Sequence, residues 1–148
     1  MKDFRWTSDL EIGIPPIDRQ HKRIIKYIVE LDSLGDNPNC DKVEEILDKL
    51  VDYTLSHFAF EEELMEESNY MFVNAHKRVH ALFVRKVSSY VTKFKSGENI
   101  TGDLLITLKT WLLNHIKNDD RDYGKAVRSA MKVKKVSWFK RMLRKLAA

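Results

Sequence analysis

The chain has 148 residues, of which 43% are hydrophobic and 32% charged, and this size and composition suit one globular domain. Five glycines and three prolines argue against a loop-rich or all-β protein, and a single cysteine excludes an internal disulfide framework or a multi-thiolate metal site. The formal net charge of +4 suggests an acidic partner at first sight. The sequence begins without the apolar stretch of a signal peptide, and no run approaches the ~18 apolar residues of a membrane-spanning helix. We therefore expect a cytoplasmic protein.

Four amphipathic helices are predicted after an irregular N-terminal arm. The arm, residues 1–17, ends at Pro15 and Pro16, and the carboxylate of Asp18 is expected to cap the first helix. Apolar residues then recur at helical spacing in four segments, which are separated by short polar breaks: 18–34, 41–65, 70–94 and 101–116. Short loops place neighbouring helices antiparallel, so the predicted fold is all-α, an up-down-up-down four-helix bundle over residues 1–123.

The remaining residues, 124–148, are predicted to form a separate basic segment. They hold nine basic residues and no acidic residue, so they contribute +9 and leave −5 for residues 1–123. One helical stripe of the segment is apolar: Val136, Phe139, Leu143 and Leu146. This pattern predicts a basic amphipathic helix that docks to a protein partner or an anionic membrane surface, or folds back on the acidic bundle. The acidic bundle itself argues against nucleic acid as a partner, and we expect it to be monomeric.

All five histidines of the chain lie on the apolar stripes of the predicted helices. Counting residues from the breaks between helices places them at similar heights, to within about one turn at ~1.5 Å per residue. An antiparallel bundle therefore gathers five imidazoles in one layer: His21, His57, His76, His80 and His115. A single buried histidine is usually a hydrogen-bonded core residue, but five in one layer would be costly without a shared partner. Imidazole with carboxylate and no thiolate is a ligand set for iron, zinc, copper or manganese.

Two carboxylates complete the predicted metal site. Glu61 follows His57 by four residues, so both lie on one face of the second helix. Two aspartates compete beside His115: Asp119, at i+4, has the better angular match, whereas Asp120, at i+5, needs a widened turn. Spacing alone therefore favours Asp119. Two octahedral metal ions bound by five imidazoles, two bridging carboxylates and one solvent bridge would keep one position for a small exogenous ligand.

These motifs are similar to those of the hemerythrin family, over roughly residues 6–123. HxxxE begins at His57, HxxxH at His76 and HxxxxD at His115, and the combination is far more specific than any one motif. The resemblance implies a non-haem di-iron centre that binds O2 reversibly, with an up-down bundle around it. Carried over residue by residue, the resemblance implies that His76, His80 and His115 hold one iron. His21 and His57 would hold the other iron, which keeps the open position. Glu61 and Asp120 would bridge the two irons. The resemblance thus favours Asp120 where spacing favours Asp119, and we follow the family.

An apolar wall is expected around the open position, because it would slow the arrival of water or anions and the loss of bound oxygen as peroxide. Six residues that lie beside the ligands or three to four positions from them would form it: Ile24, Ile25, Phe58, Trp111, Leu112 and Ile116. Core packing alone would also account for each of these six. Tyr70 and Tyr123 could hydrogen-bond to the ligands, or serve only in packing.

Two other functions compete with O2 carriage. A di-iron oxidase or ferroxidase can use a four-helix bundle, but such sites rely mostly on carboxylates with Glu-x-x-His pairs. Here five imidazoles accompany two carboxylates, and this balance favours reversible binding over oxidation. An O2 or redox sensing module is the second alternative, and its signal would have to leave through residues 124–148.

Overall fold

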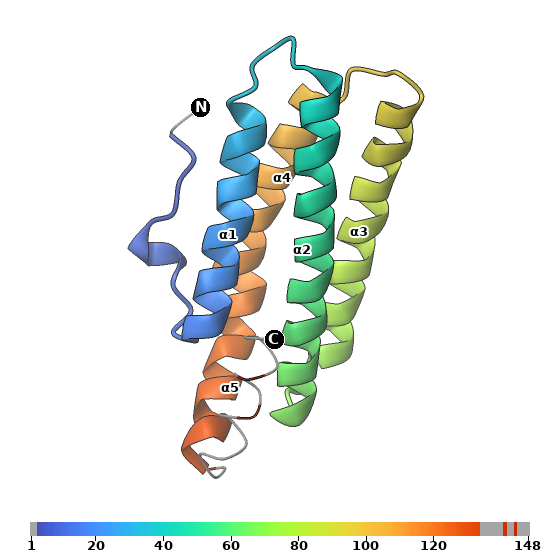
Figure 1. The fold of residues 1–148 in the computed structure, drawn as a ribbon. Coiled ribbons are helices and arrows are strands. Elements are labelled where there is room, and N and C mark those ends of the chain that lie inside the picture. Colours follow the sequence, from blue (N-terminus) through green and yellow to red (C-terminus); the bar gives the residue numbers. More distant parts are fainter. Residues whose placement is uncertain (1–2, 134–140, 142–143, 145–148) are drawn as a thin grey trace.

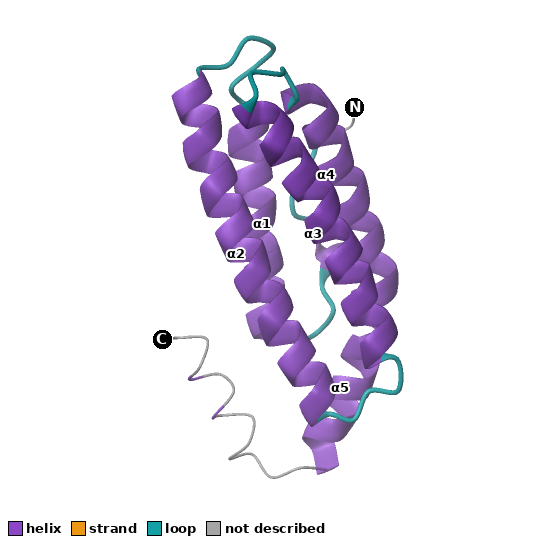
Figure 2. Ribbon diagram, turned by 90° about the vertical axis from the view of Figure 1, so that its right-hand side faces the viewer, coloured by secondary structure: helices purple, strands orange, loops and turns teal. Residues whose placement is uncertain are grey.

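The structure, a computed structural model, describes residues 3–133, 141 and 144. Seven helical elements follow one another: η1 (Ser8–Leu10), α1 (Pro15–Asp32), α2 (Cys40–Glu67), α3 (Val73–Lys95), α4 (Thr101–His115), η2 (Ile116–Asp120) and α5 (Arg121–Val133). Helices α1 to α4 run alternately up and down beside one another, joined by loops at alternating ends (Figure 1). The predicted all-α, four-helix bundle is confirmed, and no strand occurs among the residues that the structure describes (Figure 2).

Each long helix buries one apolar stripe in the common core. In α1 and α2 the stripes contain mostly isoleucine and leucine at helical spacing, and every member is almost fully buried: Ile17, Ile24, Ile28 and Leu31; Val43, Leu47, Leu50 and Leu64. Burying one such side chain contributes about 1.5–3 kcal/mol, so these stripes are what hold the polar layer described below in the interior.

The first helix begins three residues earlier than the expectation, and Asp18 is not its N-cap. Pro15 and Pro16 occupy the first turn, where the fixed φ and missing N–H of proline suit a helix. The buried carboxylate of Asp18 instead accepts a hydrogen bond from the backbone N–H of Ile12 at 2.9 Å. The arm is therefore irregular only as far as Ile14, and this bond fastens it to α1.

The fourth helix does not end in a loop. The chain passes from His115 into one π-helical turn, η2, and then directly into α5. Helix α5 crosses the boundary at residues 123 and 124 that the charge distribution suggested, and its Tyr123 and Val127 are fully buried in the core. The apolar stripe predicted for the tail, residues 136–146, lies outside the described residues.

The N-terminal arm also packs against α5. The guanidinium of Arg128 donates to the backbone carbonyl of Ile12, and that of Arg121 donates to the carbonyl of Asp9. Gly124 lies so close to the arm that an added Cβ would come 3.3 Å from the carbonyl oxygen of Ile12. The arm therefore fixes the start of α5 against the bundle. No helix in the described part of the chain is long and apolar enough to span a bilayer.

Candidate metal centre

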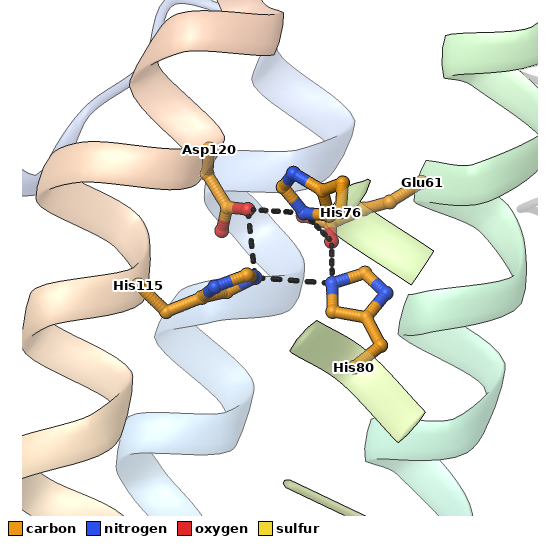
Figure 3. A group of neighbouring side chains, drawn as sticks. All are labelled: Glu61, His76, His80, His115 and Asp120. Carbon is orange, nitrogen blue, oxygen red and sulfur yellow. Dashed lines mark hydrogen bonds and ion pairs between the residues drawn. The ribbon is translucent and has the colours of Figure 1, made fainter. Parts of the chain in front are cut away.

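The five histidines meet in the interior of the bundle, as their heights predict. Their ligand atoms, with those of two carboxylates, form two overlapping groups, within each of which all chosen atoms lie within 4.8 Å of one another. The three-histidine group contains five residues, which Figure 3 shows converging from three sides: Glu61, His76, His80, His115 and Asp120. The two-histidine group contains four: His21, His57, Glu61 and Asp120. Glu61 and Asp120 belong to both groups.

Each of these two carboxylates directs one oxygen to each group. Oδ2 of Asp120 lies 3.1 Å from His21 Nε2, whereas Oδ1 lies 3.0 Å from His115 Nε2. Oε1 of Glu61 lies 3.1 Å from His57 Nε2, whereas Oε2 lies 3.2 Å from His80 Nε2. Both carboxylates therefore have the geometry of bridges between two sites.

The π-helical turn explains why Asp120, rather than Asp119, faces the interior. A π turn holds one more residue than an α turn, so it brings the i+5 residue onto the face of His115. Asp120 is 0% exposed, whereas the side chain of Asp119 is 44% exposed. The preference for Asp119 from regular spacing is therefore wrong, because the helix is not regular at this point.

Three further oxygens fix the histidine rings from behind. Nδ1 of His57 lies 2.5 Å from Gln20 Oε1, and Nδ1 of His115 lies 2.8 Å from Asp119 Oδ2. In the same way Nδ1 of His80 lies 3.1 Å from Glu62 Oε1. Since these oxygens accept hydrogen bonds, each Nδ1 carries a proton as donor, and a neutral ring then turns the lone pair of Nε2 toward the centre.

Sequence reasoning missed two of these three orienting contacts and gave the third residue another role. Glu62 follows Glu61 in the sequence but lies off the apolar stripe of α2, and it reaches His80 from the surface. Gln20 is buried beside His21, and its amide gives no periodic signal of its own. Its position one residue before a histidine on the first helix is the signal that could have found it.

Tyr123 holds the shared glutamate, Glu61, from the other side. Its hydroxyl donates a hydrogen bond to Glu61 Oε1 at 2.8 Å, and the residue is fully buried. Burial and the neighbouring carboxylates of Glu61 and Asp120 raise the pKa of Tyr123 well above its usual value, so the hydroxyl remains a donor. Tyr70 packs edge-on against Tyr123, with ring centroids 6.5 Å apart.

The electrostatics of the centre are dominated by the two buried carboxylates. Burial alone would lower the pKa of His21 and His115, but Asp120 and Glu61 raise them to about 9 and about 10. Burial dominates at His57 and lowers its pKa. The facing histidines in turn overcome burial and hold the pKa values of Glu61 and Asp120 far below their usual range. The centre therefore keeps two negative charges in the interior.

The residues fit a pair of metal ions. At the centre, six buried polar atoms have no hydrogen-bond partner within the described residues, although several lie about 3 Å apart: both ring nitrogens of His21, Nε2 of His76, Oε2 of Glu61 and both oxygens of Asp120. Such atoms would be costly to bury without a shared partner. Imidazole nitrogens and carboxylate oxygens are ligands that iron and other first-row metal ions accept.

Aromatic rings cover the three-histidine group on its apolar side. Phe58 stacks on His80 with ring centroids 3.8 Å apart, and Trp111 stacks on His115 at 4.3 Å. Phe83, which the sequence reasoning did not select, stacks on Trp111 at 3.7 Å. The other four residues expected to line the open position are buried in the same core: Ile24, Ile25, Leu112 and Ile116.

An antiparallel four-helix bundle with five inward histidines and two shared carboxylates defines a histidine-rich protein for a dinuclear metal centre. Comparison with known proteins agrees: the family model "Hemerythrin HHE cation binding domain" matches residues 13–127. The chain belongs to the hemerythrin family, and its relatives in that family support O2 binding at a non-haem di-iron centre.

Individual relatives support the same assignment. The chain is 47% identical over 131 residues to a bacteriohemerythrin of Pseudomonas aeruginosa, covering 88% of this chain and 86% of that protein. It is 35% identical over 120 residues to a myohemerythrin of Theromyzon tessulatum, covering 81% and 90%. A crystal structure of a wild-type hemerythrin superposes with a TM-score of 0.78 at 30% identity, covering 82% of this chain and 95% of that one.

Proposed function

We propose that this chain carries, stores or delivers O2 by binding it reversibly at a di-iron centre whose ligands are the seven residues of the two groups. One iron would be held by three imidazoles and the other by two, with two carboxylates bridging: His76, His80 and His115; His21 and His57; Glu61 and Asp120. The observation that carries this assignment is that each shared carboxylate turns one oxygen to each group.

The unequal histidine count supports an open position at the two-histidine group. With the bridges shared equally, that iron has one protein ligand fewer than its neighbour. When bound, the two ferrous ions supply the electrons that reduce O2 reversibly. The protein's part is to hold the ions, to orient the rings through Gln20 and Asp119, and to keep water away.

The apolar residues around the centre would perform this last task. Phe58 and Trp111 lie directly on ligand rings, and Ile24, Ile25 and Ile116 are almost fully buried in the surrounding core. A wall made almost entirely of hydrocarbon gives water and small anions little to bind. The hydroxyl of Tyr123, which lies at the centre but not in this wall, is held by its hydrogen bond to Glu61.

The test is the absorption spectrum of the iron-loaded protein, together with its metal content. We expect two irons per chain, and an oxygenated band that disappears under vacuum and returns in air over several cycles. Rapid decay of that band coupled to oxidation of an added substrate, or of further ferrous iron, would indicate an oxidase or ferroxidase instead.

The surroundings in which this chemistry takes place are a further part of the proposal. We infer a monomeric, cytoplasmic bundle whose basic segment, residues 124–148, contacts a protein partner or an anionic membrane. The charge of that segment supports it. Because α5 continues to Val133 and packs Tyr123, Val127 and Met131 against the core, the matched comparison is full-length protein against a chain ending at Val133. Selective binding of full-length protein to anionic vesicles would support the membrane version, and equal binding of both would remove it.

A further inference from the structure

Charge is divided sharply between two adjacent helices of the bundle. Helix α2 has ten acidic and two basic residues, whereas α3 has six basic residues and none that is acidic. The net charge of +4 does not reveal this division, just as it does not reveal the basic segment 124–148. A surface of one sign attracts partners of the opposite sign and speeds their association.

Most of the positive charge of α3 lies on one exposed face, which we call the basic face. Helical spacing of three, four and seven residues aligns five side chains along it: Arg78, Leu82, Arg85, Lys86 and Lys93. Leu82 is 61% exposed and adds an apolar side chain to this charged face. No carboxylate among the described residues pairs with these four cations, whereas Lys77, around the helix from this face, pairs with Glu66.

The basic face borders a hollow of about 460 Å³ between α3 and α4. Lys86 forms part of its lining, and the exposed side chain of Ile106 forms another part. The half-buried Trp111 and the buried His115 also line the hollow. Of the five histidines at the metal centre, His115 is the one that lines this hollow, so the surface comes near the centre here.

Conjugated rings continue from the hollow to the ligands of the three-histidine group. The half-buried Trp111 stacks on His115 with ring planes only 18° apart, and Nε2 of His115 lies 3.0 Å from Nε2 of His80. Asp119, which also lines the hollow, holds the far nitrogen of the His115 ring at 2.8 Å. A molecule seated in the hollow would therefore face the edge of a ligand rather than the open position.

The proposed function creates a need for such a contact. If bound oxygen is lost as peroxide, both irons remain ferric, and the centre can bind O2 again only after two electrons return. A carrier that gives one electron at a time must deliver two electrons in succession, one for each ferric ion that becomes ferrous. Each delivery oxidises the carrier once. The carrier has to approach closely, because the centre itself is buried.

We propose that the basic face and the adjoining hollow form the docking site of an acidic one-electron carrier protein, with a flavin or iron–sulfur group, that restores the ferrous centre. The proposal rests on the proposed function. The cations would attract the acidic partner, Leu82 and Ile106 would supply apolar contact, and the partner's redox group would face Trp111 and His115. Small reductants need no such surface.

The test uses air-oxidised, iron-loaded, full-length protein and reduced flavodoxin, a strongly acidic flavoprotein. The variant Arg85→Glu/Lys86→Glu reverses two charges beside the hollow, and Arg19→Glu/Lys26→Glu reverses two exposed charges on α1 as the matched control. Binding of oxidised flavodoxin is measured by calorimetry at about 20 mM and about 300 mM salt, where screening differs strongly. The rate of reduction is measured by stopped flow with flavodoxin and, separately, with dithionite.

We expect the basic-face variant to weaken flavodoxin binding and slow reduction by flavodoxin, each by about tenfold or more at low salt. Reduction by dithionite and the helical circular dichroism spectrum should not change, and the control variant should behave like the wild type. Equal losses in both variants, or no flavodoxin binding by the wild type, would overturn the proposal. Failure of the dithionite-reduced wild type to bind O2 reversibly would instead refute the proposed function.

Discussion

The two groups of the metal centre come from different halves of the molecule. The α1–α2 hairpin provides His21 and His57, and the α3–α4 hairpin with its π turn provides His76, His80 and His115. Each hairpin also provides one carboxylate, Glu61 or Asp120, which reaches into the other hairpin's group. Metal ions at this centre would therefore fasten the two hairpins together, and the unequal imidazole count makes the halves chemically different.

Loss of a shared carboxylate should have the largest effect. In Glu61→Ala both groups lose a ligand oxygen, and one carboxylate fewer neutralises the positive charge of the two ions. We therefore expect both irons to be lost. Iron per chain after gel filtration measures the effect. Glu44→Ala, at an exposed position of the same helix, is the control and should retain the wild-type iron content.

Removing one histidine from each group tests the inequality between them. His57→Ala leaves the two-histidine group with one imidazole, and we expect it to lose its iron and O2 binding. His115→Ala leaves the other group with two imidazoles, the number that the smaller group has naturally, so we expect iron to be retained in part. The iron content of the two variants is followed during dialysis against a weak chelator. Equal loss of iron from both would contradict the expected difference between the two groups.

The orienting contacts should act on one group each. Asp119→Ala frees the His115 ring and Gln20→Ala frees the His57 ring, and loss of such contacts typically weakens metal affinity about 10–100-fold. Competition with a coloured chelator would resolve a weakened and an unchanged site in each variant. Asp122→Ala, which alters an exposed aspartate in the next turn, should leave both affinities unchanged.

The hydrogen bond from Tyr123 to Glu61 affects both groups of the centre, because Glu61 is shared by them. Tyr123→Phe removes a buried hydrogen bond to a charged group, and we expect the free energy of unfolding to fall by about 1.5 kcal/mol. Urea denaturation of chelator-treated protein measures it. Tyr70→Phe, in the neighbouring ring, should change the free energy of unfolding less.

The remaining expected effect is a pH dependence of the stability of the metal-free protein. Although burial opposes it, the two carboxylates raise the pKa of His21 to about 9 and that of His115 to about 10, above the usual 6.5. Their protonation therefore stabilises the fold fully below pH 6.5, and this contribution is lost as the pH rises through 9 and 10. We expect the free energy of unfolding of chelator-treated protein to decrease from pH 7 to pH 10. A His21→Asn/His115→Asn variant should show a flatter profile.

Periodicity predicted what is regular in this molecule. Apolar stripes and short breaks predicted four helices, and counting residues predicted that His21, His57, His76, His80 and His115 meet in one layer, as the structure confirms. The errors lie at irregular places. Asp18 resembles a cap, but two prolines begin the helix before it. Glu62 lies off the apolar stripe, and its contact with His80 depends on how α2 is rotated relative to α3, which packing rather than local pattern determines.

The π turn at Ile116–Asp120 is a change of phase in an otherwise periodic pattern. Continuing the α-helical repeat from His115 would bury Asp119, Asp122 and Ala126, whereas the structure buries the residue after each: Asp120, Tyr123 and Val127. One added residue thus determines both which carboxylate bridges and which face of α5 meets the core. Deleting a single residue between 116 and 119 would place Asp120, Tyr123 and Val127 four, seven and eleven residues after His115, where a regular α-helix turns them inward, so the same three side chains would face the core without a π turn.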